Sequence, residues 1–350
     1  MNLSEILEKA IQQEASDIFL IAGLPVTMKI HGSHVRLESE KLHPDAISAL
    51  IEEIYVKGKR DKVNYDKNLD DDFSFSDPGL GRFRVNVFRQ RGSWSAVIRV
   101  IKFGIPDPAT LGIPETVLSL ADNPNGLVLV AGTAGSGKST TLACMIDRIN
   151  SKRDAHIITM EDPIEYLHAH NKSIVTQREV FVDAVSYLDA LRSALRESPD
   201  VILLGEMRDF ETISAAVTAA ETGVLLFSTL HTGSVANTIN RIIDVFPPAQ
   251  QVQMRGQLSQ LICGVVCQKL VPCTEGGLTP AFEIMRSTPA IQNMIREGKY
   301  HQLESAMQTS DGMVTMDTSL SELYRTGKIT KETALSYCSN YDLMKKRLDG

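Results

Sequence analysis

The stretch GLVLVAGTAGSGKST, residues 126–140, joins an apolar strand to a glycine-rich loop and the start of a helix. The loop matches the pattern G-x-x-x-x-G-K-[ST], in which glycines let the backbone wrap around a phosphate chain and the helix N-terminus adds its dipole. We expect Lys138 to bridge the terminal phosphates and the Ser139 hydroxyl to ligate magnesium. The predicted nucleotide-binding residues are Gly132, Thr133, Ala134, Gly135, Ser136, Gly137, Lys138, Ser139 and Thr140. The sequence therefore predicts a nucleoside triphosphate site.

Acidic side chains follow two later strands, where a nucleotide-hydrolysing enzyme needs them. MEDPIEY, residues 160–166, offers Glu161, Asp162 and Glu165, and LLGE, residues 203–206, offers Glu206. Because the carboxyl ends of parallel strands meet at one edge of a sheet, these acids and the loop can converge there. One acid can then orient the attacking water while another holds the magnesium shell. Taken singly each acid reads as a surface residue, but together with the loop they favour catalysis.

A third strand end carries a histidine. VLLFSTLHTGS, residues 224–234, places His231 just past the strand. A neutral imidazole there could donate a hydrogen bond to a γ-phosphate, and a purely structural histidine fits the pattern equally well.

The order of elements divides the chain into two parts. Residues 1–102 read as a smaller α+β domain, residues 103–114 as a proline- and glycine-containing linker, and residues 115–350 as the nucleotide-binding domain. After the linker, strands alternate with helices, which predicts an α/β fold with a mainly parallel sheet. From about residue 247 the pattern reads as wholly helical; LICGVVCQKL, residues 261–270, is interpreted as one apolar helix, and TPAIQNMIREG, residues 288–298, as another.

The first domain contains a predicted hairpin, GRFRVNVFRQRGSWSAVIRVI, residues 81–101. Its alternation points Phe83, Val85 and Val87 inward, which places Arg82, Arg84 and Asn86 together on the outer face, with Arg99 on the returning strand. From the pattern alone, this outer face reads as solvated surface.

Composition limits the possible partners. The chain has 36 Lys plus Arg against 43 Asp plus Glu, a formal charge of −7, so no overall basic field is available to hold nucleic acid. No segment approaches the ~18 consecutive apolar residues of a membrane-spanning helix, and we expect a cytoplasmic protein.

Several further motifs carry a family resemblance. They are ASDIFLIAGLP, DDFSFS, GRFRVNVF, EDPIEY, QREV, ALRSALRESPD, GEMRD, TAAETG, TLHT and AIQNMIREGK. Over essentially its whole length, the chain resembles the type IV pilus retraction ATPases, the PilT-type twitching-motility motors of the bacterial secretion ATPase superfamily.

The resemblance implies a homohexameric motor that uses ATP and Mg²⁺, with a PAS-like N-terminal domain and a RecA-like P-loop ATPase core. It implies that Glu206, which stands where many nucleotide motors have aspartate, acts on the magnesium side and that Glu165 polarises the lytic water. It assigns His231 to a γ-phosphate contact and Arg84 and Arg99, with Arg82 possible, to arginine fingers. It also implies work at the inner face of the cytoplasmic membrane, with the pilus machinery and its inner-membrane platform protein as partners.

The sequence departs from this family in three motifs. GTAGSGKS replaces GPTGSGKS, Val224 stands where the family usually has the first histidine of its His box, and AIQNMIRE replaces AIRNLIRE, so that Gln292 removes a charge. The departures put in question any signalling by that first imidazole and the contact that the family's AIRNLIRE helix usually makes.

Other functions remain open at this point. Pilus extension ATPases usually carry an additional N-terminal region and a paired CxxC motif. They resemble the chain less, because neither feature is found in this sequence. An accessory retraction ATPase fits the same motifs. A nucleic-acid translocase is opposed by the acidic charge, and a non-hydrolysing scaffold by the presence of Glu165 and Glu206.

Overall fold

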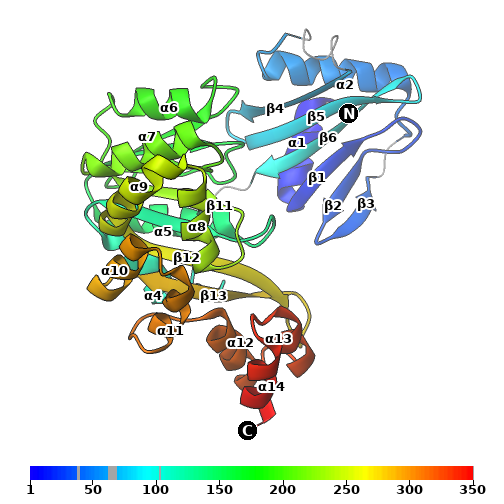
Figure 1. Ribbon diagram of the computed structural model, residues 1–350. Helices are drawn as coiled ribbons and strands as arrows, with labels where there is room; N and C mark the ends of the chain where they lie inside the picture. Colours follow the sequence, from blue (N-terminus) through cyan, green and yellow to red (C-terminus); the bar gives the residue numbers. More distant parts are fainter. Residues whose placement is uncertain (38–39, 62–68, 102–103, 350) are drawn as a thin grey trace. The chain divides into compact units, whose positions relative to one another are not determined.

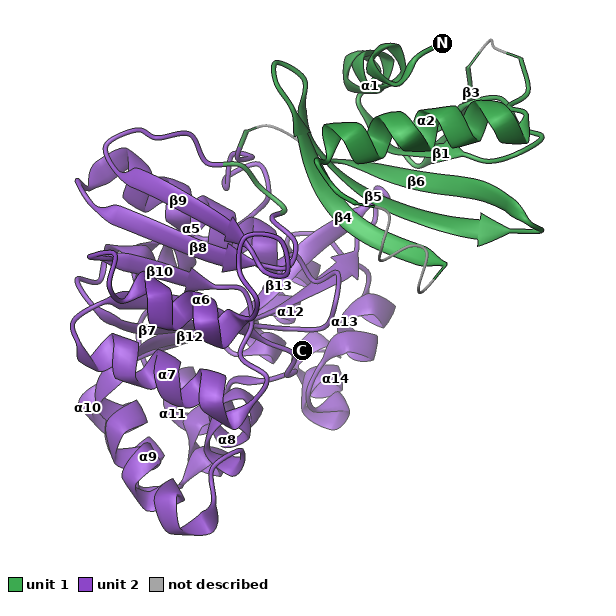
Figure 2. Ribbon diagram, turned by 90° about the horizontal axis from the view of Figure 1, so that it is seen from above, with its two compact units in different colours: residues 1–104, 165–167 green, residues 105–164, 168–350 purple. Residues whose placement is uncertain are grey.

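A computed structural model describes the chain except for residues 38–39, 62–68, 102–103 and 350. The described residues form two compact units (Figure 2), one comprising Met1–Gly104 with Glu165–Leu167 and the other Ile105–Ile164 with His168–Gly350. The predicted boundary between the first domain and the linker falls on residues 102–103, outside the described residues. Among the helices that are described, none has the length and apolar character needed to cross a bilayer.

The first unit is an antiparallel sheet with two helices, so its predicted α+β character is confirmed. The sheet has the order β3-β2-β1-β6-β5-β4. Its elements are α1 (Leu3–Gln12), β1 (Ala15–Leu20), β2 (Thr27–Ile30), β3 (Ser33–Arg36), α2 (Pro44–Lys57), β4 (Asp70–Asp77), β5 (Gly81–Gln90) and β6 (Ser93–Ile101).

The predicted hairpin is formed by β5 and β6. Phe83, Val85 and Val87 are fully buried in the core of the first unit, as the alternation predicts. Arg84 lies directly opposite Arg99 across the two strands, which places both guanidinium groups on the outer face of the sheet.

The second unit contains a seven-stranded sheet of order β13-β12-β7-β11-β10-β8-β9. The strands are β7 (Gly126–Ala131), β8 (His156–Glu161), β9 (Ile174–Glu179), β10 (Val201–Leu204), β11 (Leu225–Leu230), β12 (Ile262–Pro272) and β13 (Leu278–Arg286). All neighbouring pairs are parallel except β12 and β13, which form an antiparallel hairpin. The predicted parallel α/β core is therefore confirmed.

Helices cover both faces of this sheet (Figure 1). The described helices of this unit are α4 (Glu115–Leu118), α5 (Lys138–Lys152), α6 (Tyr187–Ala194), α7 (Phe210–Glu221), α8 (Val235–Asp244), α9 (Pro248–Leu261), α10 (Pro289–Glu297), α11 (Leu303–Gln308), α12 (Met316–Arg325), α13 (Lys331–Tyr337) and α14 (Tyr341–Asp349), with 3₁₀ turns η1 (Ser119–Asp122) and η2 (Tyr300–Gln302).

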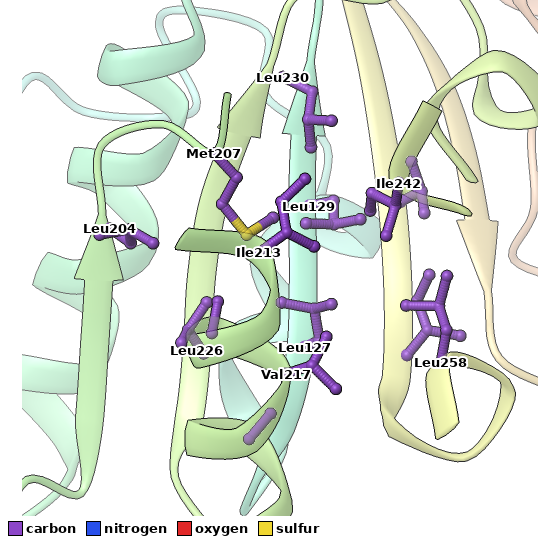
Figure 3. Close-up of a cluster of buried hydrophobic side chains, with 14 of the residues drawn as sticks. Leu127, Leu129, Leu204, Met207, Ile213, Val217, Leu226, Leu230, Ile242 and Leu258 are labelled. Carbon is purple, nitrogen blue, oxygen red and sulfur yellow. The ribbon is translucent and has the colours of Figure 1, made fainter. Parts of the chain in front are cut away.

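Strand β7 shows how the two faces are built. Leu127 and Leu129 belong to the cluster beneath α6–α11, whereas Val128 and Val130 belong to the cluster beneath α4 and α5. Figure 3 shows the first cluster, in which Leu127 and Leu129 face Ile213 and Val217 of α7. This strand is buried on both sides, which accounts for its continuous apolar sequence.

The prediction of a wholly helical segment after residue 247 is wrong. The sequence interpreted as an apolar helix, residues 261–270, forms most of β12, which pairs with β7 on one side and β13 on the other. A short apolar run fits a buried strand and a buried helix equally well, because neither shows a polar face. Here Val265 and Val266, two β-branched residues on opposite faces of the sheet, favour the strand.

The prediction for α10 is confirmed. Thr288 caps the helix by accepting a hydrogen bond from the Ile291 backbone N–H, Pro289 occupies the first turn, and Gly298 ends the helix in the left-handed conformation.

Candidate active site

The glycine-rich phosphate-binding loop (P-loop), residues 132–139, connects β7 to α5. Its shape depends on glycines. Gly132, Gly135 and Gly137 have φ angles of 151°, 76° and 87°, in the region where a side chain is disfavoured. The Gly132 N–H donates to the carbonyl oxygen of Leu230 at 3.2 Å, which ties the start of the loop to the end of β11. The loop therefore opens at the carboxyl edge of the sheet, as expected.

Lys138 begins α5 and is buried. Its Nζ atom donates to the carbonyl oxygens of Gly132 and Thr133, at 2.9 Å in each case. The ammonium group is thus held inside the curve of the P-loop, where the phosphates of a nucleotide would replace backbone carbonyls as its partners. Ser139 and Thr140 follow on the first turn of α5 and are half-buried.

Glu206 lies just beyond β10 and is surrounded by two basic side chains. Arg208 Nε lies 2.6 Å from Glu206 Oε1, and His231 Nε2 lies 3.6 Å from Glu206 Oε2. The Glu206 side chain is 15% exposed, whereas those of Arg208 and His231 are 74% and 51% exposed. The structure therefore brings Glu206 and His231 together at the ends of neighbouring strands.

Backbone contacts fix the loop that carries Glu206. The Thr229 hydroxyl donates to the Gly205 carbonyl oxygen at 2.5 Å, and the Met207 N–H donates to the Thr229 carbonyl oxygen at 3.3 Å. A Cβ atom on Gly205 would lie 2.8 Å from the Tyr187 hydroxyl and 3.0 Å from the Met160 carbonyl oxygen. Glycine is therefore required here by close packing, which sets the position of the following carboxylate.

This edge of the sheet is acidic. Burial, together with the negative charges of Glu206, Asp162 and Glu161, raises the pKa of Tyr187. Glu161 itself accepts hydrogen bonds from Thr159 at 2.6 Å and from Gln177 at 3.4 Å. Carboxylate and hydroxyl oxygens are the ligands that Mg²⁺ prefers, so Glu206 and Ser139 have the right chemistry to hold it.

The other predicted catalytic residues belong to the first unit. Glu165 is exposed. Arg84 makes a two-point contact with Asp72, at 2.9 Å from Nε and 2.6 Å from the second guanidinium nitrogen. Arg99 Nε lies 3.2 Å from Asp17 Oδ1, and the Arg99 side chain is 69% exposed.

Two residues at the site were not predicted from the sequence. Arg208 stands in the quoted GEMRD motif, two residues after Glu206, and its charge was the available signal. Gln268 contacts the P-loop helix through a 2.7 Å hydrogen bond from the Thr141 hydroxyl. It was missed because its segment was interpreted as a helix, whereas β12 runs beside β7.

A cavity of about 700 Å³ adjoins the P-loop. It is lined by Gly137, Thr140 and Thr141, by Gln268, by residues 109–113 and by the β12–β13 turn with nearby residues 326–328. Polar and apolar side chains both line this cavity beside the P-loop.

Comparison with known proteins identifies the family. The model of the type II/IV secretion system protein family matches residues 1–340. The chain belongs to this family. Proteins similar to it include the type IV pilus retraction ATPase PilT of Pseudomonas aeruginosa, 46% identical over 95% of this chain and 97% of that protein. A twitching motility protein of Neisseria gonorrhoeae is 42% identical over 98% of this chain and 91% of that protein.

A crystal structure of the pilus retraction motor PilT with bound ADP has the same fold as this type II/IV secretion system protein. Its TM-score is 0.92 at 46% identity, with 99% of each chain covered. These matches confirm the predicted resemblance to the retraction ATPases, the RecA-like fold class and the enzyme class, a P-loop ATPase.

Proposed function

We propose that the chain is an ATP-hydrolysing motor that drives type IV pilus retraction. The observation that carries the proposal is the grouping of Glu206 and His231 at the ends of β10 and β11, beside β7 and its P-loop. The motor role is supported by the near full-length similarity to proteins named as a retraction ATPase and a twitching motility protein.

Within the second unit, each group has a defined task. The P-loop N–H groups and Lys138 bind the β- and γ-phosphates, and the cavity lined by Gly137, Thr140 and Thr141 takes the base and ribose. His231, half exposed beside Glu206, donates to the γ-phosphate and links its loss to the end of β11.

Mg²⁺, when bound with ATP, neutralises charge on the phosphates, and Ser139 and Glu206 are the residues proposed to hold it. Arg208 forms an ion pair with one oxygen of the Glu206 carboxylate. Because Arg208 is largely exposed, this ion pair contributes little stability and can be exchanged when nucleotide binds.

The remaining assignments concern the first unit and the assembly. Glu165 orients the lytic water, and Arg84 and Arg99 stabilise charge on the transferred phosphoryl group. Both arginines lie on one face of the β5–β6 hairpin. The working form is proposed to be a homohexamer at the inner face of the cytoplasmic membrane, where it acts on the inner-membrane platform protein of the pilus machine.

ATP hydrolysis by the purified protein, measured with and without single-stranded DNA, tests this function. We expect magnesium-dependent hydrolysis that DNA leaves unchanged, since the formal charge of −7 offers no field for polyanion binding. Strong stimulation by DNA would favour a translocase, and bound ATP without turnover would favour a non-hydrolysing scaffold.

A further inference from the structure

Gln268 is a buried polar residue on β12, in the interior of the sheet. In the parallel pairing of β12 with β7, Cys267 is the partner of Ala131, so Gln268 lies beside Gly132, the first residue of the P-loop. Its side chain and backbone are 4% exposed. A glutamine at such a position must satisfy its amide group, because an unpaired buried polar group costs stability.

One half of the amide is satisfied by the P-loop helix. The Thr141 hydroxyl, which is fully buried, donates to Gln268 Oε1 at 2.7 Å. The backbone of Gln268 also abuts the loop, since a Cβ atom on Gly132 would lie 2.5 Å from the Gln268 carbonyl oxygen. Gln268 therefore contacts both ends of the P-loop.

The other half of the amide faces the nucleotide side. A Cβ atom on Gly137 would lie 2.8 Å from Gln268 Nε2, which places this nitrogen against the N-terminus of α5. Gln268 lines the cavity together with Gly137, Thr140 and Thr141. Among the residues that the structure describes, no oxygen accepts a hydrogen bond from Nε2. A donor is thus left at the junction of the P-loop and the cavity.

We propose that Gln268 is a nucleotide-binding residue whose Oε1 atom is fixed by Thr141 and whose Nε2 group donates a hydrogen bond to an oxygen of the bound nucleoside triphosphate. The proposal rests on the ATPase function proposed above. It explains why residue 137 is glycine beyond its left-handed conformation, because a side chain there would displace the Gln268 amide. It also gives a partner to Nε2, because among the described residues only the Oε1 half of the amide is hydrogen-bonded.

The substitution Gln268→Glu separates the two halves of the amide. It keeps an oxygen acceptor for Thr141, but it replaces the Nε2 donor by an oxygen that is negatively charged at high pH and carries a proton at low pH. At pH 8 we expect the dissociation constant for ATP to rise at least about tenfold over wild type, the size of one hydrogen bond to a charged group. The ratio of the variant's dissociation constant for ATP to that of wild type should fall towards one as the pH is lowered to 5.5.

Steady-state kinetics provide the second readout. Since the hydrogen bond is made in both the ground and transition states, KM should rise while kcat at saturating ATP stays within about twofold of wild type. Gln253→Glu, the same change on the exposed face of α9, is the matched control and should leave both constants unchanged. A purely structural role for Gln268 would lower the melting temperature without a pH-dependent change in ATP affinity.

A ratio of dissociation constants within twofold of one at both pH values would overturn the proposal. If Gln268→Glu does not fold, Gln268→Asn replaces it, because the shorter amide cannot reach from Thr141 to the nucleotide; an unchanged KM would then overturn the proposal. Lys138→Ala is measured in parallel. Loss of hydrolysis in Lys138→Ala with normal binding by Gln268→Glu would reject Gln268 alone, whereas hydrolysis by Lys138→Ala would reject the proposed function.

Discussion

The Nε2 atom of His231 lies 3.6 Å from the Oε2 atom of Glu206. The two residues come from neighbouring parallel strands, β11 and β10, which end at the same edge of the sheet. On the other side of the carboxylate, Arg208 holds Oε1 at 2.6 Å. The Glu206 carboxylate therefore lies between an imidazole and a guanidinium group, both of which are more exposed than the carboxylate itself.

Lys138→Ala should abolish hydrolysis and weaken ATP binding. The ammonium group is already positioned by the carbonyl oxygens of Gly132 and Thr133 inside the P-loop, so its removal deletes the charge that faces the β- and γ-phosphates. We expect a loss of activity of more than about 100-fold. Phosphate release and ATP titration of the purified variant measure both effects, and wild-type turnover would exclude the P-loop as the hydrolytic site.

Arg84→Ala and Arg99→Ala should each lower kcat more than they weaken ATP binding. An arginine finger acts on charge that develops in the transition state, and its loss costs up to about 10³-fold in rate. In the first unit the two guanidinium groups pair with Asp72 and Asp17.

Arg89→Ala is the control for this pair. Arg89 lies on β5, the strand of Arg84, but its guanidinium group lies over the Trp94 ring, 5.5 Å from the ring centroid. We expect nearly wild-type kcat for this variant. If Arg84→Ala and Arg99→Ala behave like Arg89→Ala, the outer face of the hairpin is ordinary surface.

The exposed face of α10 should couple hydrolysis to pilus withdrawal. Ile291 and Ile295 are buried against the core, whereas Asn293 and Arg296 are exposed. The double variant Asn293→Ala with Arg296→Ala should remain folded and hydrolyse ATP, yet fail to restore twitching to a strain that lacks the gene.

Two outcomes would contradict a coupling role for the exposed face of α10. Loss of the oligomer in size-exclusion chromatography would make α10 a subunit contact, and full twitching would show that this face has no role in coupling. Ile295→Ala, a buried position on the same helix, should instead destabilise the fold by about 2–5 kcal/mol.

Glu283 should make stability depend on pH. Burial raises the pKa of its carboxyl from an ordinary value of 4.5 to about 7, with added repulsion from Glu304 and Asp317 that the Val235 N–H and Lys269 partly offset. The folded chain therefore binds this proton more tightly than the unfolded chain does, and stability falls as pH rises from about 4.5 to 7.

Glu283→Gln removes this dependence. As the pH rises from 5 to 8, the free energy of unfolding of the variant minus that of wild type should increase by about 2–4 kcal/mol, as measured by urea denaturation. A constant difference across this range would mean that Glu283 titrates normally.

The sequence predicted the parts of the site that depend on local pattern. The P-loop was predicted from its glycine spacing, and Glu206 and His231 were each predicted to follow a strand; their approach to 3.6 Å was seen only in the structure. Gln268 could not be found in this way, because its role depends on β12 pairing with β7 across more than a hundred residues of sequence. The pattern of β12 carries no period, since the strand is buried on both faces.

The ion pairs of the candidate catalytic residues could not be predicted from the sequence either. Arg208 and Glu206 are two residues apart, and only the turn after β10 brings their side chains within 2.6 Å. The partners of Arg84 and Arg99, Asp72 and Asp17, depend on strand register in the first unit.

Twitching by a strain that lacks the gene, complemented with either wild type or Glu206→Gln, tests the central claim that hydrolysis at this site drives retraction. Glu206→Gln keeps the size and the packing of the side chain but removes the negative charge that Arg208 and His231 face. We predict that wild type restores twitching, while Glu206→Gln accumulates to the same level, binds ATP and leaves the cells immobile. Restoration of twitching by Glu206→Gln would contradict this account.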